Sequence, residues 1–158
     1  MVIYLAADHR GFALKEQLKQ FLKEEGYELY DVGNIKQDDT DDYPDFAFAA
    51  AQKVSAAPDI SRAILVCGSG VGMCVVANKL KNIRASVCLS PDHVIAARAH
   101  DAINILCIAA DFIDTQTAVA MTRSFLATPF DRQDTHVRRV QKIFSIEENN
   151  SLTSETKE

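Results

Sequence analysis

The sequence predicts a three-layer α/β/α fold, in which helices cover both faces of a Rossmann-like, five-stranded parallel sheet. Short apolar runs alternate five times with longer segments whose apolar residues recur at helical spacing. A length of 158 residues suits a single domain with its own hydrophobic core. We therefore expect one domain over residues 1–146 with an extra C-terminal helix, and a disordered polar tail over residues 147–158.

The apolar runs place strands over residues 2–7, 27–32, 62–67, 83–89 and 104–109. Helices are expected over residues 12–25, 43–54, 75–80, 91–99, 114–128 and 131–146. Ser90 and Asp114 are predicted helix caps, and Gly26 stands where a helix-ending glycine belongs. The last helix has no following strand to cross to, so its apolar stripe needs cover, for which a partner subunit is one candidate.

Composition and charge exclude several classes of protein. The net charge of −5 argues against a nucleic-acid partner, whose footprint is a basic face. No apolar run approaches the length of a membrane span, and the N-terminus lacks the features of a secretory signal, so a cytoplasmic location is expected. The four cysteines show no C-x-x-C spacing, which argues for reduced thiols and against a zinc ribbon.

The stretch with the clearest chemical signal is residues 67–72 (CGSGVG), where an apolar strand ends in a cysteine and a glycine loop follows. The N–H groups of such a loop can point together at an anion. Cys67 can be a buried strand-end residue, or a thiol whose pKa the following helix lowers so that it acts as base or nucleophile. Ser69 can relay a proton, or can serve as a loop or capping residue.

Other readings of this loop and of the histidines are weaker. Met73 occupies the position of the third glycine in a dinucleotide-binding loop, and no phosphate-loop Lys-Ser or Lys-Thr pair follows. Asp8 and His9 end the first strand, where the acid can orient the histidine or cap a helix. The four histidines are scattered without i,i+4 spacing, so no metal site is expected.

Together these features resemble the family of ribose-5-phosphate isomerase B and the galactose-6-phosphate isomerase subunits, over about residues 2–146. The motifs that carry the resemblance are residues 7–12 (ADHRGF), 40–45 (TDDYPD), 67–72 (CGSGVG), 77–79 (ANK), 83–85 (IRA) and 136–140 (HVRRV). The resemblance implies an aldose–ketose isomerase that interconverts ribose 5-phosphate and ribulose 5-phosphate, or a related sugar phosphate, through a cis-enediolate. It also implies that no metal or organic cofactor is needed.

The resemblance also implies roles for individual residues. Cys67 would be the base at carbon, Ser69 would move the hydroxyl proton, and Asp8 and His100 would assist ring opening. The residues expected to bind substrate are His9, Tyr43, Gly68, Gly70, Gly72, Asp101, His136 and Arg139. The family forms homodimers, or tetramers, with shared active sites, so the partner subunit would supply Arg139 to the phosphate.

Three positions depart from the family pattern. Asp101 replaces an asparagine, while Asp111 and Thr135 replace arginines that would contact phosphate. Three nearby arginines could compensate: Arg10, Arg132 and Arg138. The departures keep alternatives open: a non-catalytic sugar-binding or partner subunit, or an isomerase with altered substrate specificity. A thiol redox enzyme is a more distant alternative, because no resolving cysteine lies at C-x-x-C spacing.

Overall fold

The computed structural model describes the backbone of residues 1–155 and the side chains of residues 1–150. The strands are β1 (Val2–Ala7), β2 (Glu28–Asp31), β3 (Ser61–Cys67), β4 (Ala85–Val87) and β5 (Ile105–Ala109). The helices are α1 (Phe12–Glu24), α2 (Tyr43–Ala56), α3 (Val71–Ala77), α4 (Pro91–Asp101), α5 (Thr115–Ala127) and α6 (Asp134–Glu155). All strand pairs are parallel, and the strand order is β2-β1-β3-β5-β4. The predicted α/β/α fold is confirmed.

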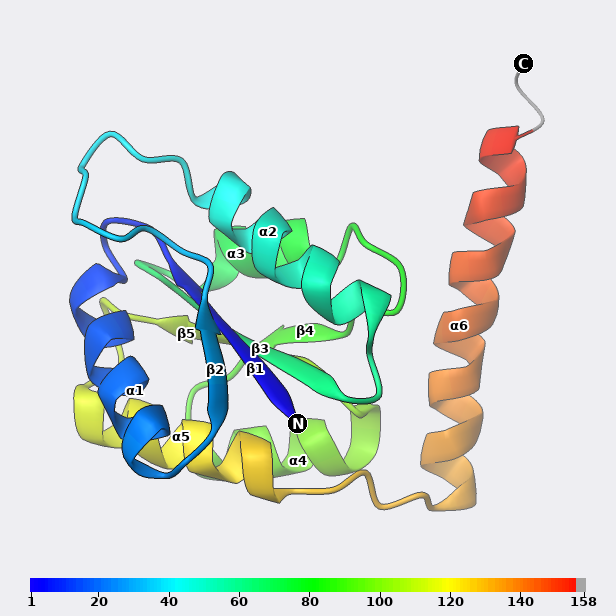
Figure 1. The fold of residues 1–158 in the computed structure, drawn as a ribbon. Coiled ribbons are helices and arrows are strands. Elements are labelled where there is room, and N and C mark those ends of the chain that lie inside the picture. Colours follow the sequence, from blue (N-terminus) through cyan, green and yellow to red (C-terminus); the bar gives the residue numbers. More distant parts are fainter. Residues whose placement is uncertain (156–158) are drawn as a thin grey trace.

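Helices cover both faces of the sheet (Figure 1), and each face has its own hydrophobic core. Along β3, Ile64 and Val66 pack with α1, α4 and α5, whereas Leu65 and Cys67 pack with α2 and α3. Successive side chains of a strand point to opposite faces, so a strand covered on both sides must be apolar throughout. This explains why residues 63–67 form an unbroken apolar run rather than an alternating pattern.

The sheet order decides which strand ends are neighbours. β1 and β5 flank β3, with Ala7 opposite Val66 and Cys67 opposite Ala109. The residues that follow β1, β3 and β5 therefore meet at one edge, the carboxyl edge of the sheet. Ligands bind at this edge in open parallel sheets.

The predicted helix boundaries are confirmed where a cap defines them. The Ser90 hydroxyl accepts a hydrogen bond from the His93 N–H at 3.2 Å, and the Asp114 carboxylate accepts one from the Thr117 N–H at 2.8 Å. Gly26 has φ +77°, a left-handed conformation in which glycine carries no steric cost. Local hydrogen-bonding chemistry therefore determines where these helices begin and end.

Several boundaries differ from the prediction, and α3 spans Val71–Ala77 rather than residues 75–80. β4 spans Ala85–Val87 rather than residues 83–89, and the Asn78 amide pairs with both the N–H and the C=O of Ala85, each at 2.9 Å. α6 continues past the end expected near Ile146 to Glu155, so most of the expected tail is helical; residues 156–158 lie outside the described residues. In Figure 1 the far half of α6 rises away from the domain. Within residues 1–155, no helix has the length and hydropathy of a membrane span.

Candidate active site at the carboxyl edge of the sheet

Cys67 and the glycine loop form the centre of the carboxyl edge. Cys67 is the last residue of β3 and is 4% exposed. The loop turns directly into α3 through Gly70, which has φ +72°. A Cβ atom on Gly70 would also lie 3.2 Å from the Ala109 backbone, so both the conformation and the space favour glycine. The loop is therefore held tightly against β5, with the thiol at its base.

Asp8 lies beside this thiol because β1 and β3 are paired to their ends. Its carboxylate is 5% exposed and accepts a hydrogen bond from the Gly11 N–H at 3.0 Å. A Cβ on Gly11 would approach the Val66 carbonyl oxygen to 2.2 Å, so this turn packs on β3 only with glycine there. Asp8 thus caps the turn before α1 and also places a negative charge close enough to act on the Cys67 thiol.

The prediction that the loop lowers the pKa of Cys67 is wrong. Burial raises the pKa of the Cys67 thiol, and the Asp8 charge raises it further. The N–H groups of Met73, Gly70 and Ser69 act in the opposite direction as hydrogen-bond donors, and they do not outweigh burial. A thiol with a raised pKa is scarcely ionised at neutral pH, but its thiolate is a stronger base.

The lowered thiol pKa belongs instead to Cys74. A hydrogen bond from Cys107 is the main reason that the pKa of Cys74 falls to about 7. Cys88 and Cys107 are buried as expected, whereas Cys74 is half-buried. All four cysteines are free thiols, as the spacing indicated. A thiol-alkylating reagent would therefore encounter a reactive Cys74 as well as Cys67.

Tyr43 and Ser69 line the same loop. Ring atoms of Tyr43 lie 2.8 Å from the position that a Cβ on Gly72 would occupy, so the ring packs directly on the loop. Pro44 follows in the first turn of α2 and helps to fix this helix start. Ser69 is exposed at the tip, and its hydroxyl accepts a long hydrogen bond from the Val71 N–H at 3.3 Å. Both side chains therefore lie at the glycine loop.

His9 is held by Asp41, a residue to which the sequence assigned no role. The Asp41 carboxylate lies 2.7 Å from His9 Nδ1 and accepts the His9 backbone N–H at 3.0 Å, while Asn34 donates to its other oxygen. This hydrogen bond, with help from the charge of Asp8, raises the pKa of His9 and favours its cationic form. The sequence signals for this partner were the four aspartates of residues 38–42 and the motif of residues 40–45, which contains Asp41.

Asp111, which replaces an expected arginine, is neutralised by Arg10. Their side chains form an ion pair at 2.5 Å, and the Asp111 N–H donates to the Gly68 carbonyl at 3.0 Å. A Cβ on Gly68 would meet Arg10 Nε at 2.6 Å and the Asp111 carboxylate at 2.8 Å, so the pair lies directly over the loop. The edge therefore retains a guanidinium group, which comes from the residues after β1 rather than from the residues after β5.

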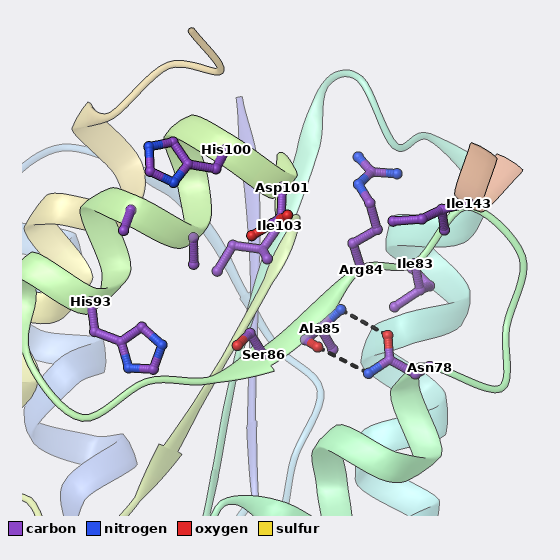
Figure 2. Close-up of a pocket in the computed structure, with 12 residues that line it drawn as sticks. Asn78, Ile83, Arg84, Ala85, Ser86, His93, His100, Asp101, Ile103 and Ile143 are labelled. Carbon is purple, nitrogen blue, oxygen red and sulfur yellow. Dashed lines mark hydrogen bonds between the residues drawn. The ribbon is translucent and has the colours of Figure 1, made fainter. Parts of the chain in front are cut away.

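A second group of predicted residues lies elsewhere in the chain. His100 and Asp101 end α4, whereas His136 and Arg139 lie on α6. The rings of His100 and His136 are 4.5 Å apart, and His136 Nδ1 lies 2.9 Å from the Asp131 carboxylate. Figure 2 shows His100 and Asp101 at a pocket of about 470 Å³ beside β4.

Within a single chain, this second group of residues lies away from Cys67. α4 starts near the carboxyl edge and runs back for 11 residues, about 16 Å at the helical rise, to His100. The Cys67 group and the His100 group therefore lie at different ends of the domain. A direct contact between Cys67 and His100 of the same chain, as a single-chain site would require, is not formed.

The expectation that the histidines are scattered is wrong for two of them, because His100 and His136 are distant in the sequence but adjacent in the structure. His100, Asp131 and His136 have ligand atoms within 4.8 Å of one another, the one such cluster among the side chains that the structure describes. Imidazole and carboxylate groups at this separation have the chemistry to hold a transition-metal ion. The hydrogen bond between Asp131 and His136 gives the cluster a structural role as well, because it fixes the start of α6.

The carboxyl edge thus joins a buried thiol, a buried carboxylate, a tight loop of N–H groups and two basic side chains, His9 and Arg10. This arrangement defines a Rossmann-like α/β protein with a site for acid–base chemistry on an anionic ligand. The sequence model of the ribose/galactose isomerase family matches residues 3–143. The chain belongs to the ribose/galactose isomerase family.

Individual relatives agree with this assignment. A probable ribose-5-phosphate isomerase B of Mycoplasma genitalium is 38% identical over 145 residues, with 92% of this chain and 95% of that protein covered. The crystal structure of the Mycoplasma genitalium enzyme with bound ribulose-5-phosphate superposes with a TM-score of 0.90, at the same coverage. A 4-deoxy-4-sulfo-D-erythrose isomerase of Clostridium sp. is 34% identical, with 94% of this chain and 96% of that protein covered.

Proposed function

We propose that this protein is an aldose–ketose isomerase that interconverts ribose 5-phosphate and ribulose 5-phosphate without a cofactor. The observation that carries the proposal is the buried Cys67 thiol at the base of the glycine loop, beside the buried carboxylate of Asp8. The relative whose structure contains ribulose-5-phosphate covers nearly the whole chain and supports the choice of substrate.

Cys67 is the proposed base at carbon. The thiolate removes the proton from C2 of the open-chain aldose, and the electron pair of that C–H bond forms the cis-enediolate. The thiol then returns the proton to C1, while Ser69 moves the hydroxyl proton from O2 to O1. The raised pKa of Cys67 suits a base for a weakly acidic C–H bond, because base strength increases with pKa. The N–H groups of the loop stabilise the developing oxyanion.

Asp8 and His100 are proposed to open the sugar ring, and Tyr43 is proposed to line the sugar site. His9 is the proposed phosphate contact, since the hydrogen bond from Asp41 favours its cationic form. Arg10 lies next to it in the chain and carries the guanidinium group nearest the loop. We assign Arg10 to the phosphate in place of the family arginine that Asp111 replaces.

The active site is proposed to be shared between the two subunits of a homodimer. His100, Asp101, His136 and Arg139 are then supplied to Cys67 by the partner subunit. Two features of the single chain support this arrangement: the His100 group is remote from the same chain's Cys67, and apolar side chains are exposed around the edge strand β4. These exposed side chains are Val71, Val75, Leu89, Ile95 and Ile143.

A coupled assay for ribulose 5-phosphate formation from ribose 5-phosphate tests the proposed function. We expect turnover without added metal. The second candidate function is an isomerase for a sugar with another anionic group, which the sulfo-sugar isomerase relative and the replaced arginines favour. A substrate panel that contains a sulfonated tetrose distinguishes the two functions. Thermal stabilisation by sugar phosphates without any turnover would contradict isomerase activity and would favour the non-catalytic binding subunit.

Replacing Arg10 by alanine is expected to raise KM for ribose 5-phosphate about tenfold or more, because a charge-assisted phosphate contact is lost. The effect on kcat should be smaller, since the phosphate is remote from the reacting carbons. Arg123→Ala is the matched control: its side chain is 59% exposed and ion-paired with Glu25, against 58% for Arg10. Steady-state kinetics measure both, and equal KM values would show that Arg10 does not contact substrate.

A further inference from the structure

A second cavity, of about 690 Å³, lies between α6 and the amino edge of the sheet, away from Cys67. Four arginines from four separate segments line it: Arg62, Arg84, Arg98 and Arg132. Arg62 is five positions before Cys67 on β3, about 16 Å at the rise of a strand. The cavity therefore belongs to a different part of the molecule from the site at the carboxyl edge.

The charges of these arginines are poorly compensated. Arg62, Arg84 and Arg98 donate hydrogen bonds to backbone carbonyl groups, such as Thr128 for Arg98 at 3.1 Å. Among the described side chains, none of the four arginines forms an ion pair with a carboxylate. Burial, with the charges of Arg62 and Arg84, lowers the pKa of Arg98 to about 10.

The acids that face the cluster leave a positive surplus. Asp59 lines the cavity and acts on Arg62, and Glu147 acts on Arg84 while it accepts the Asn82 N–H at 3.0 Å. Four cations against two carboxylates leave a surplus of about two charges. A phosphate monoester carries about this charge with opposite sign at neutral pH.

Arg132 adds an independent observation. Its φ of +57° is left-handed, a conformation that residues other than glycine and asparagine adopt uncommonly. The guanidinium group of Arg132 is thus presented to the cavity at a backbone cost, and strained backbone of this kind clusters at ligand sites. Beside the arginines the cavity has an apolar wall, formed by Pro129, Phe130, Val137, Val140 and Phe144.

We propose that this cavity is a second anion site, which binds a phosphorylated small molecule with its phosphate on the arginines and its apolar part against the wall. The volume is within the range of small-molecule sites. The inference does not rest on the proposed isomerase activity, because no residue of the Cys67 edge takes part in it.

Isothermal titration of the full-length protein with phenyl phosphate tests the site. Phenyl phosphate has the phosphate and an apolar body but none of the sugar hydroxyls. We expect saturable binding that is tighter than that of inorganic phosphate, and Arg132→Gly and Arg132→Asn should each weaken it about tenfold or more. Both residues tolerate the left-handed backbone, so circular dichroism should show an unchanged fold.

Arg123→Ala is the control, because it removes one exposed arginine that does not line the cavity and should leave the affinity unchanged. Equal affinity of the wild type and both Arg132 variants would overturn the proposal. So would an absence of heat at millimolar phenyl phosphate. Binding that is lost in Arg10→Ala and retained in Arg132→Gly would place the ligand at the carboxyl edge instead, and would also overturn it.

Discussion

Cys67→Ala should lower kcat for ribose 5-phosphate isomerisation on the order of a thousandfold, because alanine carries no group that can accept the carbon-bound proton in place of the proposed thiolate. The substitution removes one buried sulfur atom and leaves the loop backbone intact, so the fold should persist with a small loss of stability. The coupled ribulose 5-phosphate assay measures the loss, and the melting temperature verifies the fold.

Cys74→Ala is the matched control, since it removes a half-buried thiol of lower pKa from the same face of the sheet. We expect its kcat to stay close to that of the wild type. Substitution is a cleaner test than alkylation here, because Cys74 would compete for the reagent. Full activity of Cys67→Ala, or loss of activity in Cys74→Ala alone, would remove Cys67 from the mechanism.

The pH dependence of kcat/KM is a second test of Cys67 as the carbon base. Burial raises the pKa of the Cys67 thiol, so the catalytic thiolate is a minor form at neutral pH and its fraction grows as the pH rises. The value of kcat/KM should therefore increase through the neutral range toward the raised thiol pKa. A profile that is flat above pH 7 would show that the thiol is already ionised.

Mixed dimers should recover activity from two inactive variants. Cys67→Ala removes the base, and His100→Ala removes the group that the partner supplies. Co-expression gives mixed dimers in about half of the population, and one of the two sites in each is then complete, so about a quarter of wild-type activity should return. The assay compares the co-expressed pair with each variant alone.

A third variant makes this experiment specific. Asp8 lies beside Cys67 in the same chain, so Asp8→Asn and Cys67→Ala impair the same half of the site. In their mixed dimers one site lacks Asp8 and the other lacks Cys67, so these dimers should remain inactive. Recovery with Asp8→Asn, or no recovery with His100→Ala, would refute a site shared in this way.

Much of the site could be predicted from the sequence because its residues are local to strand ends. Cys67 ends one apolar strand and the glycines follow it, while Asp8 follows another apolar strand. Parallel strands bring their carboxyl ends to one edge. Ser90, Asp114 and Gly26 were equally predictable, since a cap depends on a few neighbouring backbone groups. In contrast, the direction of the Cys67 pKa shift was predicted wrongly, because burial is a property of the packed fold.

The sequence by itself determined the fold class, the family and the cysteine–glycine loop, because these depend on apolar periodicity and on residues adjacent in the chain. The tertiary structure decided which distant side chains meet. Asp41 holds His9, and Asp111 holds Arg10 over Gly68, only because the loop after β2 and the end of β5 reach the same edge. It also separated His100 from Cys67, since a helix that leaves the carboxyl edge ends at the opposite one.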